Sequence, residues 1–189
     1  MSTRELKEAS SPLAELSQKY DILPERELNE SLGKKALGVS NNEDDESDGP
    51  RRLTCINEKY SGQNHPETGV PYVEKTVKDG EGNEVTGVFP QFDSVFDAQL
   101  PDDLLQESDS KQFSEANRQL KEKYDSDPEF RSQFDERQRE SIENGGYPYG
   151  YVWHHNEETG KLQLVDYETH AKTRHTGGKA IWGGGSENR

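Results

Sequence analysis

The sequence predicts an α+β fold, and three observations along its 189 residues support that class. Short runs rich in Val, Tyr, Thr and Phe, separated by turn residues, occupy positions 53–105. Two stripes of apolar residues at helical spacing follow within positions 108–143. A strand–turn–strand–helix pattern then occupies the last section. We therefore expect a small ββα unit at the C-terminus, supported by two helices and an irregular section of short strands.

Residues 1–52 form an acidic segment whose composition differs from that of the rest of the chain. Residues 1–50 carry 12 acidic and 6 basic side chains and a single aromatic residue, Tyr20. Residues 41–50 are mostly Asn, Asp, Glu, Ser and Gly, which is the composition of a linker. We expect a solvated, partly disordered spacer with a helix or two at most, and a docking arm for a partner is the alternative. Residues 53–189 then form the folded domain.

Two short strands are predicted in the turn-rich section, at residues 70–77 and 84–92. Both runs are rich in residues that favour extended backbone. Residues 79–83 between them read Asp-Gly-Glu-Gly-Asn, and glycine and asparagine tolerate the backbone angles of a tight turn. We therefore expect a β-hairpin here, within a section of short strands and coil that precedes the helices.

Two helices are predicted next. The first is indicated by apolar residues spaced three, four and four positions apart, namely Phe113, Ala116, Leu120 and Tyr124. The second is expected to begin with Asp127 as its N-cap and Pro128 in its first turn, and to end at Asn144 and the two glycines after it. Its apolar stripe consists of Phe130, Phe134 and Ile142. In both helices the apolar stripe is narrow and most other side chains are charged, so each helix must pack against another part of the protein to be stable.

The last section predicts a strand, a turn, a second strand and a helix, with its core at about residues 147–178. Residues 149–156 form the first strand, in which alternate side chains point to opposite faces. Residues 157–160 end in glycine and form the turn, and residues 162–165 return as the second strand. Asp166 is placed to cap the helix that follows.

Four of the five histidines lie on this unit, and their placement suits a divalent metal ion. His154 and His155 are adjacent in the first strand, so one can face the metal ion and the other the water that attacks. The helix adds His170 from across the hairpin, and His175 follows five positions later. Neutral imidazole suits zinc, nickel and related transition metals better than calcium. The pattern therefore predicts a metal cradle.

Composition and charge exclude several classes of protein. The net charge of −15 disfavours a basic protein that coats nucleic acid or binds anionic membranes, although residues 145–189 are neutral, with five acidic and five basic side chains. The single cysteine, Cys55, excludes an intramolecular disulfide framework and a cysteine-based zinc ribbon. No apolar run approaches the ~20 residues of a membrane span, and the polar first residues lack a signal-peptide core. We expect a soluble protein made in the cytoplasm, with no membrane span.

The C-terminal unit resembles a known family. Trp153-His154-His155, residues 162–165, His170, and His175 with the Thr-Gly-Gly after it look like the WHH-type nucleases of the HNH/endonuclease VII superfamily. These are largely bacterial polymorphic toxins, found as C-terminal modules of secreted proteins. Weaker similarity upstream extends the resemblance to roughly residues 60–185, through positions 65–71, 87–90, 92–94 and 112–117. The resemblance implies a ββα-metal, HNH-like fold and nuclease activity.

The resemblance also implies a role for each histidine. Colicin-type DNases of the same superfamily likewise carry paired histidines followed by two more from the helix. By that likeness His154 is a metal ligand, His155 is the general base, and His170 and His175 are the remaining ligands. The implied cofactor is one divalent ion, either zinc, nickel, manganese or magnesium.

Two departures from the family pattern bear on these roles. The asparagine that braces the loop of the base in the HNH pattern would fall at Lys161, so that brace must come from elsewhere. His170 and His175 are five positions apart, where the colicin-type spacing is four. Five positions of an ideal helix rotate by about 140°, so His175 shares the metal only if the helix ends or bends before it. Arg174, four after His170, is expected to contact phosphate, and the other cations expected to hold the nucleic acid backbone are Lys172 and Lys179.

Taken together, the resemblance implies a metal-dependent endonuclease that hydrolyses phosphodiester bonds, in DNA in preference to RNA. It implies an antibacterial toxin that is exported or delivered into target cells without a signal peptide, and a cognate immunity protein in the producing cell. Two alternatives stay open: a catalytically silent, metal-stabilised binding module, and a structural zinc site closed by four histidines.

Overall fold

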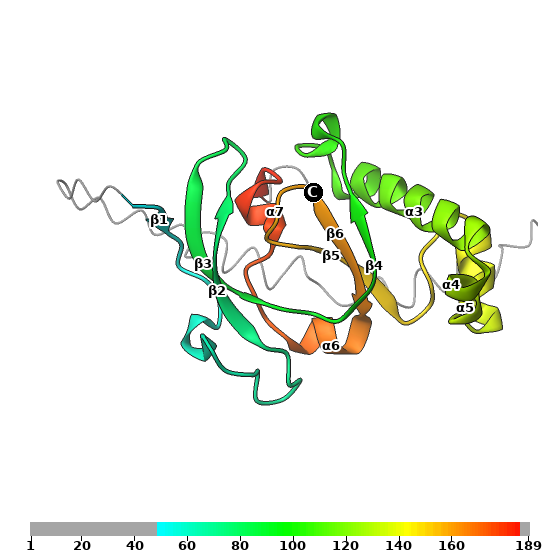
Figure 1. The fold of residues 1–189 in the computed structure, drawn as a ribbon, viewed down its shortest axis with the longest axis horizontal. Coiled ribbons are helices and arrows are strands. Elements are labelled where there is room, and N and C mark those ends of the chain that lie inside the picture. The colour runs from blue at the N-terminus through cyan, green and yellow to red at the C-terminus, as the bar shows by residue number, and fades with distance from the viewer. Residues whose placement is uncertain (1–48, 186–189) are drawn as a thin grey trace, which may run out of the picture. The chain divides into compact units, whose positions relative to one another are not determined.

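A computed structural model describes residues 49–185. The spacer expected at residues 1–52 therefore lies outside the described residues, except for its last four positions. Within the described range the chain forms two three-stranded sheets with helices beside them, in agreement with the predicted α+β class (Figure 1). No helix in this range is long and apolar enough to cross a membrane.

The first sheet is built around the predicted hairpin. Its strands are β1 (Arg51–Arg52), β2 (Tyr72–Lys78) and β3 (Glu84–Pro90), in the order β1-β3-β2. β2 and β3 pair antiparallel over their whole length, which confirms the hairpin. The side chain of Asp79 accepts hydrogen bonds from the backbone N–H groups two and four residues later, both at 3.0 Å, and so shapes the loop. A single-turn 3-10 helix, η1 (Glu58–Tyr60), precedes β2.

The second sheet carries two of the predicted site histidines. It consists of β4 (Ser94–Gln99), β6 (Lys161–Asp166) and β5 (Tyr151–His155), in that order and all antiparallel. β6 is the central strand, and its residues 162–165 are all buried. β4 lies in the section expected to hold short strands and coil, but it is not one of the two strands predicted there. The register of β4 against β6 shifts between Ser94 and Phe96, and such an irregularity breaks the alternation by which a strand is recognised in a sequence.

The first predicted helix is α3 (Asp109–Ser126), which follows the 3-10 helix η2 (Asp102–Leu104). Its buried side chains are Gln112, Ala116, Leu120 and Tyr124, so the predicted stripe is confirmed except that Phe113 is only partly buried. The polar Gln112, which the apolar pattern omits, extends the buried stripe by one turn.

The second predicted helix is wrong as a single element, because it is two: α4 (Pro128–Ser132) and α5 (Glu136–Glu143). The predicted N-cap is confirmed, since the Asp127 side chain accepts from two backbone N–H groups at 3.0 Å. Asp135 explains the break. Its side chain accepts from the N–H of Gln138 at 2.8 Å, and the Gln138 side chain accepts from the N–H of Asp135 at 3.0 Å. This reciprocal capping box starts a new helix.

The C-terminal region has the predicted order of strand, turn, strand and helix. β5 and β6 form a hairpin whose turn ends at Gly160, which has a φ of 74°. α6 (Tyr167–Lys172) follows β6 directly, and the side chain of Asp166 accepts from the Thr169 N–H at 2.8 Å, which confirms the cap.

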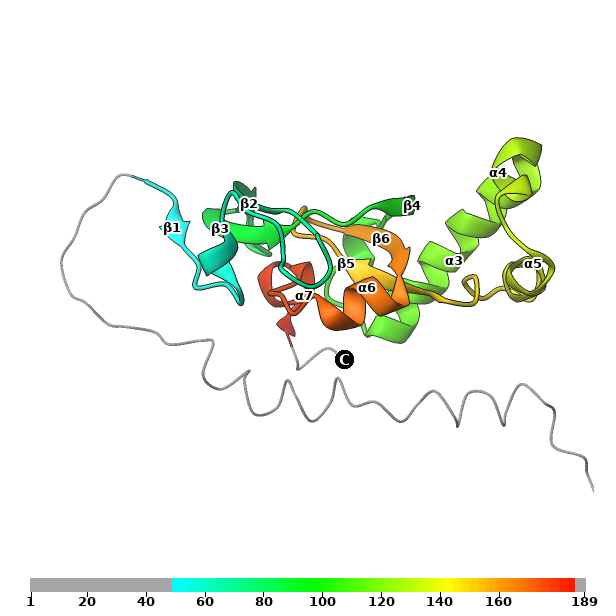
Figure 2. The same ribbon diagram turned by 90° about the horizontal axis from the view of Figure 1, so that it is seen from below.

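A last short helix, α7 (Gly178–Ile181), lies between the two sheets in Figures 1 and 2. The N–H of Gly80 in the first hairpin donates to the carbonyl of Ile181, and the Trp182 indole N–H donates to the carbonyl of Asn156 at the end of β5. A Cβ at Gly178 would lie 1.8 Å from that same carbonyl oxygen, so only glycine allows this approach. α7 therefore ties the end of β5 to the first sheet.

The main core lies between the second sheet and helices α3, α4 and α5. It contains Trp153 from β5 together with Leu162 and Leu164 from β6. A smaller cluster, formed by Val70, Phe92 and Val165, packs with Val152. Val152 and Trp153 are neighbours in β5 and belong to different clusters, as the alternation of a strand requires. Because side chains two positions apart in a strand lie on the same face, His154 lies on the face of Val152 and His155 on the face of Trp153.

Candidate metal centre

Three of the four predicted histidines meet. His154 comes from β5, His170 from α6, and His175 from the segment between α6 and α7. The Nδ1 atom of His154 lies 3.3 Å from Nε2 of His170 and 3.2 Å from Nε2 of His175. One ring nitrogen of each residue lies within 4.8 Å of the others. We call these three residues the histidine triad.

His175 joins the triad because α6 ends before it. The helix stops at Lys172, and Thr173 leaves helical geometry with φ −91° and ψ 85°. The five-residue spacing from His170 required the helix to end or bend before His175, and it does end there. His175 Nδ1 donates to the carbonyl of Thr173 at 2.7 Å, which leaves the lone pair of Nε2 directed toward the triad.

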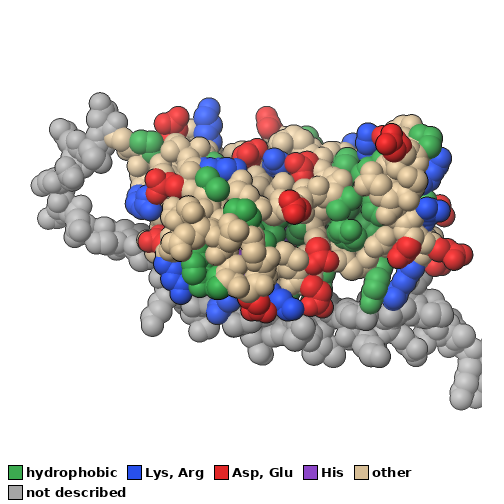
Figure 3. All heavy atoms as spheres, turned by 60° about the horizontal axis from the view of Figure 1, so that its bottom comes forward, with side chains coloured by type: hydrophobic (Ala, Val, Ile, Leu, Met, Phe, Trp, Pro, Cys, Tyr) green, Lys and Arg blue, Asp and Glu red, His purple; other side chains and the backbone are tan. Residues whose placement is uncertain are grey.

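A phenylalanine covers the triad, in which His154 is buried and His170 and His175 are partly buried. The ring of Phe92 packs against all three imidazoles, at centroid distances of 4.8, 5.4 and 5.3 Å. Scarcely any histidine surface is visible on the face drawn in Figure 3. Burial lowers the pKa of His154 and of His175, and it lowers the pKa of His170 from 6.5 to about 3. All three rings are held in the neutral form, which is the form that binds metal.

The donor set of the triad fits a transition-metal ion. Three neutral imidazole nitrogens converge, and zinc and nickel favour such ligands. His154 Nε2 is buried and makes no hydrogen bond to any residue that the structure describes, so this ring is oriented by packing and by the other two rings. Within residues 49–185 the group has three members. Three protein ligands are typical of a catalytic site, whereas a closed structural site has four.

His155 lies on the opposite face of β5, as its position in the strand predicts. Its ring packs between Phe113 and Trp182, at centroid distances of 5.3 and 5.7 Å. Its Nε2 atom lies 2.8 Å from Oε1 of Gln112 and 3.7 Å from a carboxylate oxygen of Asp109. A zinc site closed by all four histidines is therefore not formed.

Gln112 holds the ring of His155 in a defined orientation. Its amide nitrogen donates to the carbonyls of Leu104 and Leu105 at 2.8 and 2.9 Å, so its oxygen must face His155. Sequence reasoning missed this residue. The signal that could have found it is its position four residues before Ala116, on the buried stripe of α3.

Lys179 shares the same oxygen and corrects one expectation. Its Nζ atom lies 3.0 Å from Gln112 Oε1 and donates to the carbonyl of Glu107 at 2.8 Å. It also lies 3.1 Å from Asp109, and the residue is only 3% exposed. Lys179 therefore does not lie at the surface to hold a nucleic acid backbone, because α7 buries it against α3. Lys172 and Arg174, by contrast, are exposed, and Lys172 lies 3.7 Å from Glu168.

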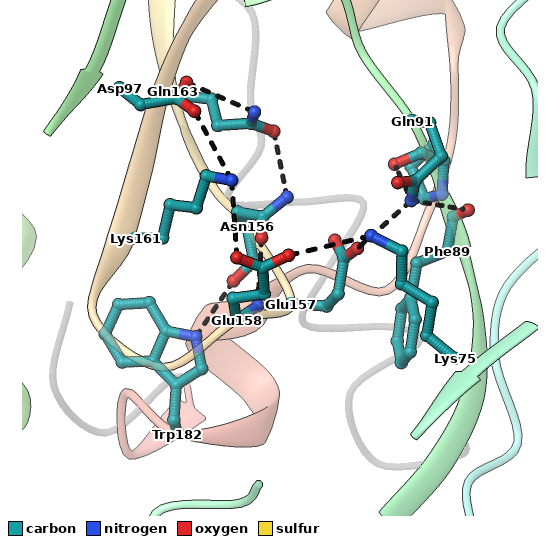
Figure 4. Close-up of polar contacts among 11 residues, drawn as sticks. Lys75, Phe89, Gln91, Asp97, Asn156, Glu157, Glu158, Lys161, Gln163 and Trp182 are labelled. Atoms are coloured by element: carbon teal, nitrogen blue, oxygen red, sulfur yellow. Dashed lines mark hydrogen bonds and ion pairs between the residues drawn. The ribbon is translucent and has the colours of Figure 1, made fainter. Parts of the chain in front are cut away.

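The turn after His155 is braced by a polar network, drawn in Figure 4. Asn156 donates to the side chain of Gln163 at 2.9 Å and accepts from the N–H of Glu158. Lys161 lies 3.3 Å from the carboxylates of both Asp97 and Glu158. Lys161, at the position of the missing HNH asparagine, thus bridges the hairpin through ion pairs, while Asn156 supplies the amide.

Glu157 connects this turn to the first sheet. Its side chain is 1% exposed and lies 2.6 Å from Nζ of Lys75 in β2. Gln91 donates to the same carboxylate oxygen at 3.1 Å (Figure 4). A buried carboxylate is stable only with such partners. Glu157 therefore holds the turn against Lys75 and Gln91, which both precede the second sheet in the chain.

Comparison with known families identifies the family of the chain. A family model for the DNase/tRNase domain of colicin-like bacteriocins matches residues 81–177, just over half of the chain. The chain belongs to this family. The matched region includes His155 and all three residues of the triad. Searches of curated proteins and of solved structures find no match to the chain.

Membership in the colicin-like bacteriocin nuclease family makes the chain a nuclease of the toxin type, and hence a hydrolase with a nucleic acid substrate. The matched region begins within the loop of the first hairpin. Strands β1 and β2 therefore precede the matched region, although Lys75 of β2 contacts the turn that follows His155.

Proposed function

We propose that this chain is a metal-dependent endonuclease of the WHH type that hydrolyses phosphodiester bonds in DNA, with RNA as the second substrate class. The observation that carries the proposal is the convergence of three neutral imidazole nitrogens on one point. A fourth histidine stands next to the first in the same strand, with its ring held by an amide oxygen. This division into a ligand group and a separately oriented imidazole suits hydrolysis better than storage or structural support.

His154, His170 and His175 would hold one divalent ion. Bound there, the ion would supply Lewis-acid stabilisation to the scissile phosphate and to the leaving oxygen. Burial keeps the three imidazoles neutral, so no proton has to leave before they bind at neutral pH. Zinc and nickel suit this all-nitrogen set best, and manganese and magnesium are the other candidates.

His155 is the proposed general base, which takes a proton from the attacking water. Gln112 Oε1 can only accept hydrogen bonds, so it places the proton of the neutral ring on Nε2. The lone pair that accepts the proton of water is then on Nδ1. Holding one tautomer spares the ring a rearrangement during proton transfer.

Arg174 is the proposed contact to the phosphate, assisted by Lys172. Both side chains are exposed on the segment that links His170 to His175, so they lie next in the chain to the proposed ligands. A guanidinium group suits bidentate recognition of a phosphate. Such local contacts are needed because the whole chain carries a net charge of −15.

The biological role that we propose is that of an antibacterial toxin that is delivered into target cells. A nuclease of this kind endangers the cell that makes it. We therefore include a cognate immunity protein among its partners.

Incubation of the full chain with plasmid DNA and with RNA tests the proposed activity. We expect cleavage in the presence of zinc, nickel, manganese or magnesium, and none with a chelator. His154→Ala should lose metal binding and cleavage together. His155→Ala should lose cleavage while it still binds metal, because its ring lies outside the triad. Intact DNA and RNA with every ion would contradict the proposal and favour the silent, metal-stabilised module.

A further inference from the structure

The segment that carries His175 is hydrogen-bonded to residues that lie before position 81, where the match to the family model begins. We call residues 173–176 the ligand turn. The hydroxyl of Tyr72 donates to the carbonyl of Arg174 at 2.6 Å, and the amide of Asn57 donates to the same carbonyl at 2.7 Å. The N–H of Ile56 donates to the hydroxyl of Thr176 at 3.0 Å. The ligand turn is thus held at Arg174 and at Thr176 by Tyr72 of β2 and by two residues that directly precede η1.

A third tie reaches the hydrogen-bond partner of His175. The hydroxyls of Thr68 and Thr173 lie 2.6 Å apart, and Thr173 is fully buried. The carbonyl of Thr173 accepts the Nδ1 proton of His175 at 2.7 Å. His65 Nδ1 accepts from the N–H of Thr68 and lies 3.1 Å from its hydroxyl. Two threonines therefore connect the loop before β2 to the imidazole of His175.

These hydrogen bonds fix the backbone around His175, which a helix would fix if α6 continued that far. His170 is oriented by α6, but the helix ends at Lys172, so it does not orient His175. A turn of a few residues has many conformations, and a ligand on such a turn binds metal weakly unless the turn is fixed beforehand. Burial raises the pKa of Tyr72, so its hydroxyl stays protonated and can donate.

We infer that Tyr72 and Thr68 are positioning residues for the metal centre, which hold the ligand turn so that His175 completes the triad. This inference rests on the proposed function, because it concerns the affinity of the same metal site. Both residues precede residue 81, where the match to the family model begins. The metal centre of this chain is therefore supported by residues that lie before the region matched to the family model.

Zinc affinity of the full chain, measured by competition with a chromophoric chelator, tests the inference without any assay of cleavage. Tyr72→Phe should weaken zinc binding about tenfold, since loss of a partner that orients a ligand typically costs 10–100-fold in affinity. The matched control is Tyr60→Phe, whose ring packs 5.9 Å from that of Tyr72 but whose hydroxyl does not contact the ligand turn. It should bind zinc as the unaltered chain does.

A double-mutant cycle separates positioning of His175 from a general effect on folding. In the His175→Ala background, Tyr72→Phe should cause no further loss of zinc affinity, because the ligand on which it acts is absent. A tenfold loss in both backgrounds would overturn the inference, as would a Tyr72→Phe chain that binds zinc normally. If the unaltered chain binds none of zinc, nickel, manganese and magnesium, the proposed function falls together with the inference.

A second variant keeps the test decisive if Tyr72→Phe fails to fold. Thr68→Val removes the hydroxyl that contacts Thr173 and should also weaken zinc binding about tenfold. Its matched control is Thr76→Val, which breaks a similar contact between hydroxyls, the 2.8 Å pair of Thr76 in β2 and Thr86 in β3. Equal zinc affinity of Thr68→Val and Thr76→Val would overturn the inference.

Discussion

The alternation of side chains along one strand separates the two histidines that stand side by side in the sequence. His154 faces the small cluster around Phe92, where burial keeps it neutral among the other imidazoles. His155 faces α3, where Gln112 accepts its Nε2 proton. A one-residue shift in the register of β5 would exchange these surroundings, so the pairing with β6 decides which histidine joins the triad.

Replacement of Gln112 tests the orientation of His155. Gln112→Met removes the amide oxygen at 2.8 Å from Nε2, so kcat should fall about tenfold or more while zinc affinity changes less than about twofold. The loss of stability should be about 1–3 kcal/mol, because Lys179 and two carbonyls lose a buried partner. The measurement is kcat together with zinc affinity of the same preparation.

The control for this change lies on the same helix. Gln119 makes two hydrogen bonds with the backbone of Gln99, away from His155. Gln119→Met should therefore leave kcat unchanged. Equal activity of the Gln112 and Gln119 variants would mean that the amide does not orient the base.

The stability of the metal-free protein should depend on pH in the acidic range. The pKa of His170 is about 3 in the folded chain and 6.5 without burial, so below pH 6.5 the unfolded chain binds more protons than the folded one. Stability is therefore lost as pH falls from about 6.5, and His170 alone accounts for about 2 kcal/mol at pH 5. The lowered pKa values of His154 and His175 act in the same direction.

Denaturant unfolding in the presence of a chelator, at pH 7 and at pH 5, measures this dependence. His170→Gln removes one titrating group, so the difference in stability between the two pH values should become smaller than in the unaltered chain. Carboxylates that titrate in the same range are common to both proteins and cancel in the comparison. An unchanged difference would contradict the assigned burial of His170.

At the scale of elements, local signals predicted most of what lies near the site. Three predictions that depend only on residues close together in the sequence are confirmed: the Asp-Gly-Glu-Gly-Asn loop, the stripe of α3 and the Asp166 cap. The split between α4 and α5 was also local, in Asp135 and Gln138, but the spacing of Phe134 and Ile142 suggested one continuous helix. β4 was missed because its irregular register hides its pattern.

The cap of α6 offers a test at this scale. Asp166→Ala removes the acceptor of the Thr169 N–H, so the helix should be less stable by about 1 kcal/mol. Because α6 carries His170, zinc affinity should fall as well. Asp135→Ala is the matched control: it removes the cap of α5, with a similar loss of stability, but α5 carries no member of the triad.

The comparison of the two cap variants decides between local and general effects. Thermal unfolding and zinc affinity are measured on both. If both variants lose zinc affinity equally, the effect comes from global stability rather than from the placement of His170. Loss confined to Asp166→Ala would support α6 as the element that orients this ligand.

At the scale of the molecule, the histidines could be predicted, but the residues that support them could not. The resemblance to WHH nucleases singled out His154, His155, His170 and His175 because their spacing is local. The cover by Phe92, the brace by Gln112 and the burial of Lys179 all depend on contacts between distant segments. Lys179 seemed a surface cation in the sequence because nothing near it shows that α7 packs against α3.

The distribution of charge also acts at this scale. Residues 145–189 are neutral, whereas the excess of acidic side chains lies in residues 1–144. Acidic and basic groups are interspersed on the face drawn in Figure 3, which presents no continuous basic surface there. Long-range attraction of nucleic acid is therefore weak, and binding must depend on contacts at the site.

Metal binding should stabilise the described domain as a whole. The triad joins β5, α6 and the ligand turn, so an ion bound there holds three segments of the folded state that are not held together in the unfolded chain. At a free zinc concentration about 100-fold above the dissociation constant, the gain is about 2.7 kcal/mol. For a domain of this size that corresponds to a rise in Tm of about 5–10 °C.

Thermal unfolding with zinc and with a chelator measures this gain. His154→Ala should abolish most of the rise, because that ring contacts both other members of the triad. Tyr60→Phe should keep it, since its hydroxyl does not contact the ligand turn. A similar rise in the His154→Ala chain would place the stabilising ion elsewhere, because removal of the central ligand leaves two imidazoles, and two ligands hold zinc far more weakly than three.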